Sequence, residues 1–295
     1  MKNQSLLDFI GNTPLIKANK IATKEGVSLY LKLEGNNPGG SVKDRPAFNM
    51  IRAAFDRNDI KKGDYLIEAT SGNTGIALAM IAQQFELQIE LVMPENSTKE
   101  RVQTMEAFGA KVTLTPAADG IEGSRIYAEK QVVEKGYYML DQFANPDNWK
   151  AHYKTTGPEI WRDTEGKITH FVSAMGTTGT IMGTSTFLKE KNAAIQIVGA
   201  QPDDHSKIPG IRKWAPAFVP KIFDAKKVDQ VIEVSEAEAR TMTKRLAKEE
   251  GVFAGMSSGG SVAAALKLAE TLKKGIIVAI ICDRGDRYLS SDLFE

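Results

Sequence analysis

Short apolar runs flanked by Gly, Pro or Asn recur along this chain, and longer segments with helical periodicity separate them. Several runs are apolar at consecutive positions, which is typical of strands that are buried on both faces of a parallel sheet. Strands that alternate with helices form βαβ units. The sequence therefore predicts an α/β fold with doubly wound parallel sheets. The predicted strands are 29–33, 65–69, 89–93, 111–115, 170–174, 195–199 and 276–281.

The predicted helices are amphipathic or rich in Ala and Leu. One of them opens with Ser235, and Glu238 follows three residues later, which is a capping-box signature. A chain of 295 residues suits two α/β lobes, and we interpret the polar, turn-rich stretch 145–148 as a lobe boundary. The predicted helices are 74–85, 99–108, 124–135, 235–250 and 261–272.

The charge balance argues against a protein that binds polyanions. The 38 Lys and Arg residues and the 37 Asp and Glu residues leave a formal net charge of +1, so no strong field favours nucleic acid or an acidic membrane. No apolar stretch reaches the roughly 20 residues that span a bilayer, and the first residues lack the apolar core of a secretory signal. We therefore expect a cytoplasmic protein. The three His residues are scattered, so we predict no metal site. The single cysteine, Cys282, is expected to be a small core residue.

Lys43 stands out because it follows a tight loop rich in Gly, Asn and Pro. Ser41 is predicted to cap the helix that follows, which places Lys43 in the first helical turn. The helix dipole disfavours a cation at that end. Lys43 is therefore a candidate for a lysine with a lowered pKa or one that forms a Schiff base. The alternative is a solvated surface lysine beside Asp44.

Three further stretches place Gly and hydroxyl residues between a strand and a helix or at a helix start. The stretch 68–75 offers backbone N–H groups and hydroxyls to a carboxylate or a phosphate. The stretch 173–181 suits a single phosphate, because it is neither a Walker A loop nor a dinucleotide fingerprint. The stretch 255–260 carries a hydroxyl pair, and no His lies in the sequence context of a catalytic triad. Each stretch, taken alone, is also compatible with an ordinary capped turn.

In combination these stretches resemble the fold type II pyridoxal-phosphate enzymes, and among them the B-type cysteine synthases, or O-acetylserine sulfhydrylases. The resemblance runs over essentially the full length of the chain. It implies two doubly wound α/β lobes, similar to the tryptophan synthase β-subunit, with pyridoxal 5'-phosphate in the cleft between them. The larger, cofactor-binding lobe would comprise 1–35 and 146–295, and the smaller, mobile, substrate-binding lobe 36–145. The motifs that carry the resemblance are 11–15, 37–45, 70–75, 176–180, 257–260 and 281–290.

The resemblance assigns roles to individual residues. Lys43 matches the Schiff-base lysine, and Asn73 matches the residue that hydrogen-bonds the pyridoxal ring hydroxyl. Ser257 matches the partner of the pyridine nitrogen, and a neutral Ser does not keep that nitrogen protonated as an Asp would. The turn that matches the cofactor phosphate loop consists of Gly176, Thr177, Thr178, Gly179 and Thr180. The residues that match the cradle for the substrate α-carboxylate are Thr70, Ser71, Thr74 and Gln142.

The activity that the resemblance implies is β-replacement on an activated serine. O-acetyl-L-serine would lose acetate, sulfide would add to the β-carbon to give L-cysteine, and Lys43 would remove and return the α-proton. Two half-reactions at one site predict ping-pong kinetics. The expected partners are these small molecules and a second copy of the chain in a homodimer, with no nucleic acid and no membrane. The alternatives are serine or threonine dehydration, threonine or cystathionine synthesis, and a catalytically silent protein that keeps the pyridoxal-phosphate fold for binding.

Finer features favour the B type. Arg212 and Lys213, followed by Trp214, match a basic segment that is linked in the B type to larger anionic sulfur donors such as thiosulfate, which would yield S-sulfocysteine. Arg212 is thus a further predicted substrate-binding residue. Lys213 keeps the positive charge but lacks the planar fork of Arg. We expect the three Trp residues, Trp214 among them, to be packing residues.

Overall fold

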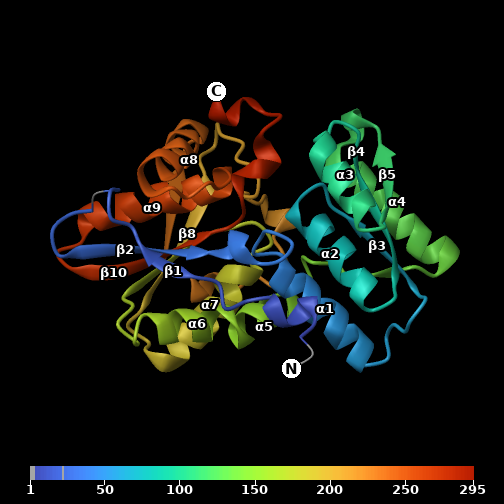
Figure 1. Cartoon of the computed structure of the whole chain (residues 1–295), viewed down its shortest axis with the longest axis horizontal. Coiled ribbons are helices and arrows are strands. Elements are labelled where there is room, and N and C mark those ends of the chain that lie inside the picture. The colour runs from blue at the N-terminus through green and yellow to red at the C-terminus, as the bar shows by residue number, and fades with distance from the viewer. Residues whose placement is uncertain (1–3, 22) are drawn as a thin grey trace. The chain divides into compact units, whose positions relative to one another are not determined.

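The computed structural model describes residues 4–21 and 23–295, and within them the chain forms two compact units (Figure 1). The first unit comprises the chain up to Ile10 together with Lys43–Asn148, and the second comprises Gly11–Val42 and Trp149–Glu295. The stretch 145–148, which the sequence suggested as a boundary, adjoins the division between the two units after Asn148, but from Pro146 on it is helical rather than a turn. Helix α5 (Pro146–Lys154) begins there, because Pro is well suited to the first position of a helix, where its missing N–H is not needed.

The first unit is built on a parallel sheet. Among the described residues the strand order is β5-β4-β3-β6, and each neighbouring pair of strands is parallel. The strands are β3 (Tyr65–Ala69), β4 (Gln88–Pro94), β5 (Lys111–Thr115) and β6 (Tyr138–Met139). The helices are α1 (Asp44–Asp56), α2 (Asn73–Gln84), α3 (Lys99–Ala107) and α4 (Gly120–Lys135).

Both faces of this first sheet are covered, because successive side chains of a strand point to opposite faces. Leu66 and Ile89 lie in the core that includes α1 and α2. Ile67 and Val92 lie in a separate core with Ala128 of α4. Burial on both faces explains why these strands read as continuous apolar runs in the sequence.

The second unit holds a larger sheet, with strand order β1-β2-β10-β7-β8-β9 among the described residues. β1 pairs with β2 in antiparallel fashion, and the other neighbouring strands are parallel. The strands are β1 (Leu15–Lys17), β2 (Val27–Leu33), β7 (His170–Ala174), β8 (Gln196–Pro202), β9 (Gln230–Val234) and β10 (Gly275–Ile281). Besides α5, the helices are α6 (Thr156–Asp163), α7 (Gly179–Lys191), α8 (Glu236–Glu250) and α9 (Met256–Thr271).

Helices lie on both faces of the second sheet. Figure 1 shows α8 and α9 on one side of β2 and β10, and α5, α6 and α7 on the other side. The core under α9 contains Ile277 and Ala279 of β10. The core under α7 contains Val278 and Ile280, the alternate residues of the same strand. This arrangement is the doubly wound α/β fold that the sequence predicts.

The predicted strands are all present, with ends that differ by a few residues at most, and the predicted helices are present too. The capping box is confirmed: the Ser235 hydroxyl accepts from the Glu238 N–H, and a Glu238 carboxylate oxygen accepts from the Ser235 N–H at 2.8 Å. Short 3-10 helices lie at Leu6–Phe9, Glu34–Asn36, Ala117–Asp119, Pro216–Phe218, Ala225–Lys227, Gly285–Tyr288 and Asp292–Phe294. In the described part of the chain, none of the helices combines the length and the apolar character needed to cross a membrane.

Candidate functional site

Two of the stretches that the sequence singled out, 68–75 and 173–181, lie at the carboxyl ends of parallel strands, where α/β sheets bind ligands. In the first unit, β3 ends at Ala69 and α2 begins at Asn73. In the second unit, β7 ends at Ala174 and α7 begins at Gly179. Each connection is therefore a strand-to-helix turn, as predicted.

The 176–180 turn of the second unit has the properties of an anion site. Thr178 caps α7 with φ of +70°, a left-handed conformation that a β-branched residue rarely adopts. Its side-chain oxygen Oγ1 is buried and has no hydrogen-bond partner among the described residues. Such an atom is costly to bury unless a ligand satisfies it, and the exposed N–H groups of a helix N-terminus attract a phosphate.

Gly176 in this turn has no room for a side chain. A Cβ atom added there would lie 2.8 Å from the carbonyl oxygen of Gly210. Gly210 has φ of +88°, a conformation that favours glycine. The close approach of these two glycines makes Gly210 part of the turn's surroundings. The sequence reasoning missed Gly210, although the Pro209-Gly210 pair is itself a turn signal.

The segment that follows Gly210 runs alongside the 176–180 turn. The backbone N–H of Arg212 donates to the Met175 carbonyl at 2.8 Å. The indole N–H of Trp214 donates to the Gly176 carbonyl at 2.9 Å. The expectation that Trp214 is only a packing residue is therefore wrong, since its indole N–H also hydrogen-bonds the backbone of the 176–180 turn.

Ser257 lies in the first turn of α9, whose N-cap is Gly255. A Cβ atom on Gly210 would lie 3.3 Å from the Ser257 hydroxyl oxygen. The backbone of Gly210 therefore lies between Ser257 and the 176–180 turn. The start of α9 is fixed by Asp283, whose carboxylate accepts from the Gly255 N–H at 3.2 Å and from the Tyr288 hydroxyl at 2.7 Å. The second unit thus brings Ser257, the turn and the 210–214 segment together.

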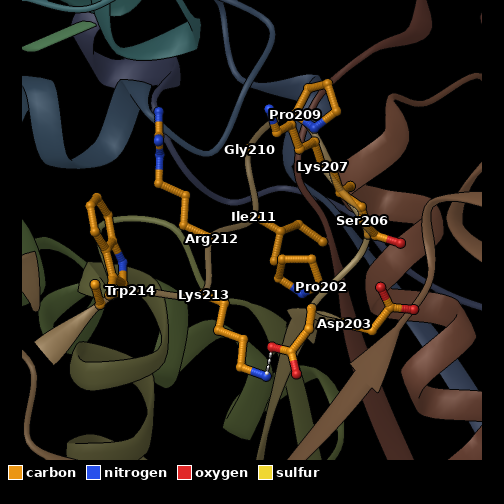
Figure 2. Close-up of a pocket in the computed structure, with 13 residues that line it drawn as sticks. Pro202, Asp203, Ser206, Lys207, Pro209, Gly210, Ile211, Arg212, Lys213 and Trp214 are labelled. Carbon is orange, nitrogen blue, oxygen red and sulfur yellow. Dashed lines mark hydrogen bonds and ion pairs between the residues drawn. The ribbon is translucent and has the colours of Figure 1, made fainter.

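The 202–215 segment lines a pocket of about 720 Å³ (Figure 2). Arg212 and Lys213 point in opposite directions in this pocket (Figure 2). The Arg212 guanidinium lies 5.4 Å from the centroid of the Trp214 ring, within cation–π range. Arg212 is therefore a cationic side chain in the lining of this pocket.

Lys213 forms ion pairs with two carboxylates. Its Nζ lies 2.6 Å from Asp204 Oδ1 and 2.6 Å from Glu233 Oε1. Hydrogen bonds to these two carboxylates raise the pKa of Lys213 above its ordinary value. The sequence suggested that Lys213 preserves the charge of a basic pair. Lys213 keeps this charge, but Asp204 and Glu233 offset it, and the pair with Glu233 ties the 202–215 segment to β9.

Lys43 is the N-cap residue of α1, which begins at Asp44. Its side chain is half-buried. The prediction that Ser41 caps this helix is wrong: Ser41 forms an isolated β-bridge with Asp283, and the next N–H, that of Val42, donates to the Cys282 carbonyl at 2.8 Å. These strand-like contacts hold the chain extended up to Val42, so the helix starts two residues later than Ser41 would allow.

The predicted carboxylate-binding residues of the first unit lie around the start of α2. The Thr74 hydroxyl donates to Gln142 Oε1 at 2.8 Å, although 68 positions separate the two residues. Thr70 and Thr74 are buried, and Ser71 is partly exposed. Asn73 is the first residue of α2. The first unit thus joins Gln142 to the 70–74 loop.

Glu68 is a second residue that the sequence reasoning missed. It is 4% exposed in β3, and its carboxylate accepts hydrogen bonds from the backbone N–H groups of Asp141 (3.1 Å) and Gln142 (3.3 Å). Burial raises the pKa of Glu68 to about 7. The sequence carried a signal for Glu68, because a glutamate in an otherwise apolar, buried strand needs a hydrogen-bond partner.

Cys282 lies at the end of β10 and is 9% exposed. Its side chain packs in the core that includes Phe171 and Ile280. The interpretation of Cys282 as a core residue is confirmed. In the described part of the chain, no cluster of three or more His, Cys, Asp or Glu side chains has the arrangement of a metal site.

Comparison with known proteins agrees with this geometry. Residues 6–283 match the family model described as pyridoxal-phosphate dependent enzyme. The chain is 55% identical over 291 residues to cysteine synthase B of Pseudomonas aeruginosa, covering 99% of this chain and 97% of that protein. It is 53% identical over 290 residues to cysteine synthase B of Escherichia coli, covering 98% and 96%. The crystal structure of O-ureido-L-serine synthase superposes with a TM-score of 0.94 at 38% identity, covering 100% and 95% of the two chains.

Proposed function

Because this chain belongs to the family of pyridoxal-phosphate dependent enzymes, we propose that it is a cysteine synthase. It replaces the acetate group of O-acetyl-L-serine with sulfide and releases L-cysteine and acetate. The high identity to two bacterial cysteine synthases B over nearly the whole chain supports this reaction. The cofactor is pyridoxal 5'-phosphate.

The observation that carries the proposal is the 176–180 turn. The buried Oγ1 of Thr178 lacks a partner among the described residues, and the turn opens onto the N-terminus of α7. A phosphate monoester supplies the acceptor oxygens and the negative charge that such a turn favours. The turn therefore fits the cofactor phosphate. Ser257 would face the pyridine nitrogen, and Asn73 the ring hydroxyl.

Pyridoxal phosphate, when bound, withdraws electrons from the α-carbon of an attached amino acid. Lys43 would hold the cofactor through its ε-amine and then, once displaced by the substrate amine, move the proton at the α-carbon. Because Ser257 is neutral, it would not keep the ring nitrogen protonated, and the cofactor would then be a milder electron sink that suits loss of the β-substituent. The residues that would bind the substrate α-carboxylate are Thr70, Ser71, Thr74 and Gln142.

We propose that the Arg212 pocket receives the sulfur donor. A guanidinium binds an anion such as thiosulfate by paired hydrogen bonds, and Lys213 does not add a second free cation because Asp204 and Glu233 neutralise it. Replacement of Arg212 by Met should therefore raise the KM for thiosulfate and leave the KM for sulfide unchanged. Lys213→Met leaves the Asp204 and Glu233 carboxylates without their cation near this pocket, so it should also raise the KM for thiosulfate and leave the KM for sulfide unchanged.

We further propose that the enzyme is a cytoplasmic homodimer. Residues 36–145 would be the mobile, substrate-binding part of each chain. Ordering of the 70–74 loop around the substrate carboxylate would exclude water from the reacting atoms.

The decisive experiment adds O-acetyl-L-serine to the purified protein loaded with pyridoxal phosphate. The visible spectrum of the cofactor should change as acetate is released, and sulfide or thiosulfate should then restore it. Lys43→Ala should lack the resting visible band and the turnover. A dehydratase would instead release a keto acid without any nucleophile, and a silent binding protein would keep the band without turnover. An unchanged spectrum with O-acetyl-L-serine would refute the proposed reaction.

A further inference from the structure

Glu68 joins two segments of the first unit that lie far apart in the sequence. Its two carboxylate oxygens accept from two successive backbone N–H groups, those of Asp141 and Gln142, and 73 and 74 positions separate the partners. Asp141 has φ of +51°. A non-glycine residue keeps this left-handed conformation only where its surroundings hold it. The two hydrogen bonds from Glu68 are such a restraint.

The segment that Glu68 holds carries the Gln142 side chain. The Gln142 carbonyl accepts from Asn148 Nδ2 at 2.6 Å, and its side-chain Oε1 accepts from the Thr74 hydroxyl at 2.8 Å. Gln142 is 5% exposed, so its amide has little freedom once the backbone is fixed. Because Oε1 accepts from the Thr74 hydroxyl, the amide nitrogen of Gln142, Nε2, keeps a fixed direction.

We propose that Glu68 is a positioning residue for substrate binding: its carboxylate fixes the 141–142 backbone and thereby aims the Gln142 amide at the substrate carboxylate. We call this arrangement the Glu68 clasp (Glu68 with the N–H groups of Asp141 and Gln142). The inference rests on the proposed function, since it concerns the carboxylate site of that function. Glu68 itself does not need to touch the substrate.

The clasp depends on the charge state of Glu68. The ionised carboxylate offers an acceptor oxygen to each N–H group, whereas the protonated form turns a hydroxyl toward one of them. Burial is the main cause that raises the pKa of Glu68 to about 7; the Asp141 carboxylate raises it further, and Arg125 and the two backbone N–H groups lower it. The clasp is therefore expected to loosen as the pH falls through neutrality.

The first test measures the clasp without any ligand. Amide hydrogen exchange of the holoprotein, corrected for intrinsic rates, should show strong protection at Asp141 and Gln142 at about pH 8, and weaker protection at about pH 6. Glu68→Gln should weaken this protection at both pH values, because its amide offers one acceptor oxygen and turns an NH2 donor toward the other N–H group. Unchanged protection in Glu68→Gln, or protection that does not vary with pH, would overturn the clasp.

The second test asks whether the clasp serves a carboxylate. L-alanine carries the α-amino and α-carboxylate groups of the substrate but no leaving group, and L-alaninamide lacks the carboxylate. Binding of each is followed by the cofactor spectrum. Glu68→Gln should raise the Kd for L-alanine about tenfold or more, since a hydrogen bond to a charged group is lost, and should leave the Kd for L-alaninamide unchanged.

Glu90→Gln is the matched control. Glu90 is 1% exposed and lies in the neighbouring strand β4, but it is bonded to Lys111 and Thr113 rather than to the 141–142 backbone. If Glu90→Gln weakens L-alanine binding as much as Glu68→Gln does, general loosening of the sheet explains the effect and the proposal is wrong. Should Glu68→Gln fail to fold, Glu68→Asp and the pH dependence of exchange in the natural protein decide the matter. A natural protein that shows no spectral response to amino acids would refute the proposed function, while hydrogen exchange would still judge the clasp.

Discussion

The buried ion pair between Lys32 and Glu159 is expected to contribute strongly to the free energy of unfolding of the second unit. The Lys32 side chain is 0% exposed in β2, and its Nζ lies 2.8 Å from Glu159 Oε2 and 2.6 Å from the Thr13 carbonyl. The Glu159 side chain is 8% exposed, and its other oxygen accepts from the Asn12 N–H at 2.9 Å. Lys32→Met keeps the length of the side chain but removes the charge.

The expected cost is that of a buried carboxylate without its cation. Breaking a buried pair by removing one partner costs about 3–5 kcal/mol, because Glu159 keeps the hydrogen bond from Asn12 but loses its neutralising charge. At about 2–4 °C for each kcal/mol in a domain of this size, the Tm should fall by at least about 6 °C. Asp163, 3.5 Å from Nζ and 22% exposed at its side chain, remains hydrated and adds little to this cost.

The assay is thermal and urea unfolding of the holoprotein, with two companions. Lys32→Met combined with Glu159→Gln should recover most of the loss, because the stranded charge is also removed. Lys167→Met, which breaks a pair whose side chains are 65% and 74% exposed, should cost no more than about 1 kcal/mol. The reasoning is refuted if Lys32→Met is as stable as Lys167→Met, or if the double variant is less stable than Lys32→Met alone.

Three shorter predictions follow from other contacts. Gly176→Ala places a Cβ 2.8 Å from the Gly210 carbonyl oxygen, so it should weaken the binding of pyridoxal phosphate and leave the binding of pyridoxal unaltered. Equilibrium dialysis measures both affinities, and equal losses of affinity for the two compounds would contradict this prediction. Gly183→Ala places a Cβ 2.0 Å from the Trp149 carbonyl oxygen, so the backbone must shift. The free energy of unfolding, measured in urea, should fall by about 3 kcal/mol or more. A fall of less than about 1 kcal/mol would show that α5 and α7 move apart easily. Burial raises the pKa of Glu68 from 4.5 to about 7, so this group destabilises the folded state increasingly as the pH rises through that window, by about 3 kcal/mol in total. The stability of Glu68→Gln relative to the natural protein should therefore increase from about pH 5 to about pH 8 in urea unfolding, and no change across that window would count against the shifted pKa.

The fold class and the Gly- and Thr-rich strand-to-helix turns could be predicted from the amino-acid sequence alone. Strand β10 is an unbroken apolar run because both of its faces are buried. Burial on both faces requires an apolar side chain at each position, so the run is visible in the sequence. The capping box of Ser235 and Glu238 is likewise local, since its two partners lie three positions apart. Lys43 was identified by its motif and by its place near a helix start.

Contacts between residues far apart in the sequence could not be predicted, because they depend on how whole elements pack. Glu68 reaches the N–H of Gln142 across 74 positions, and Trp214 reaches the Gly176 carbonyl across 38. The hydrophobic patterns of strands and helices predict which face a side chain occupies. They do not predict which distant segment of the chain packs against that face. Lys213 shows the consequence: its type and neighbours suggested an anion-binding cation, and the register of β9 placed Glu233 beside it instead. Local chemistry is encoded residue by residue, whereas the pairing of charges depends on how whole elements pack.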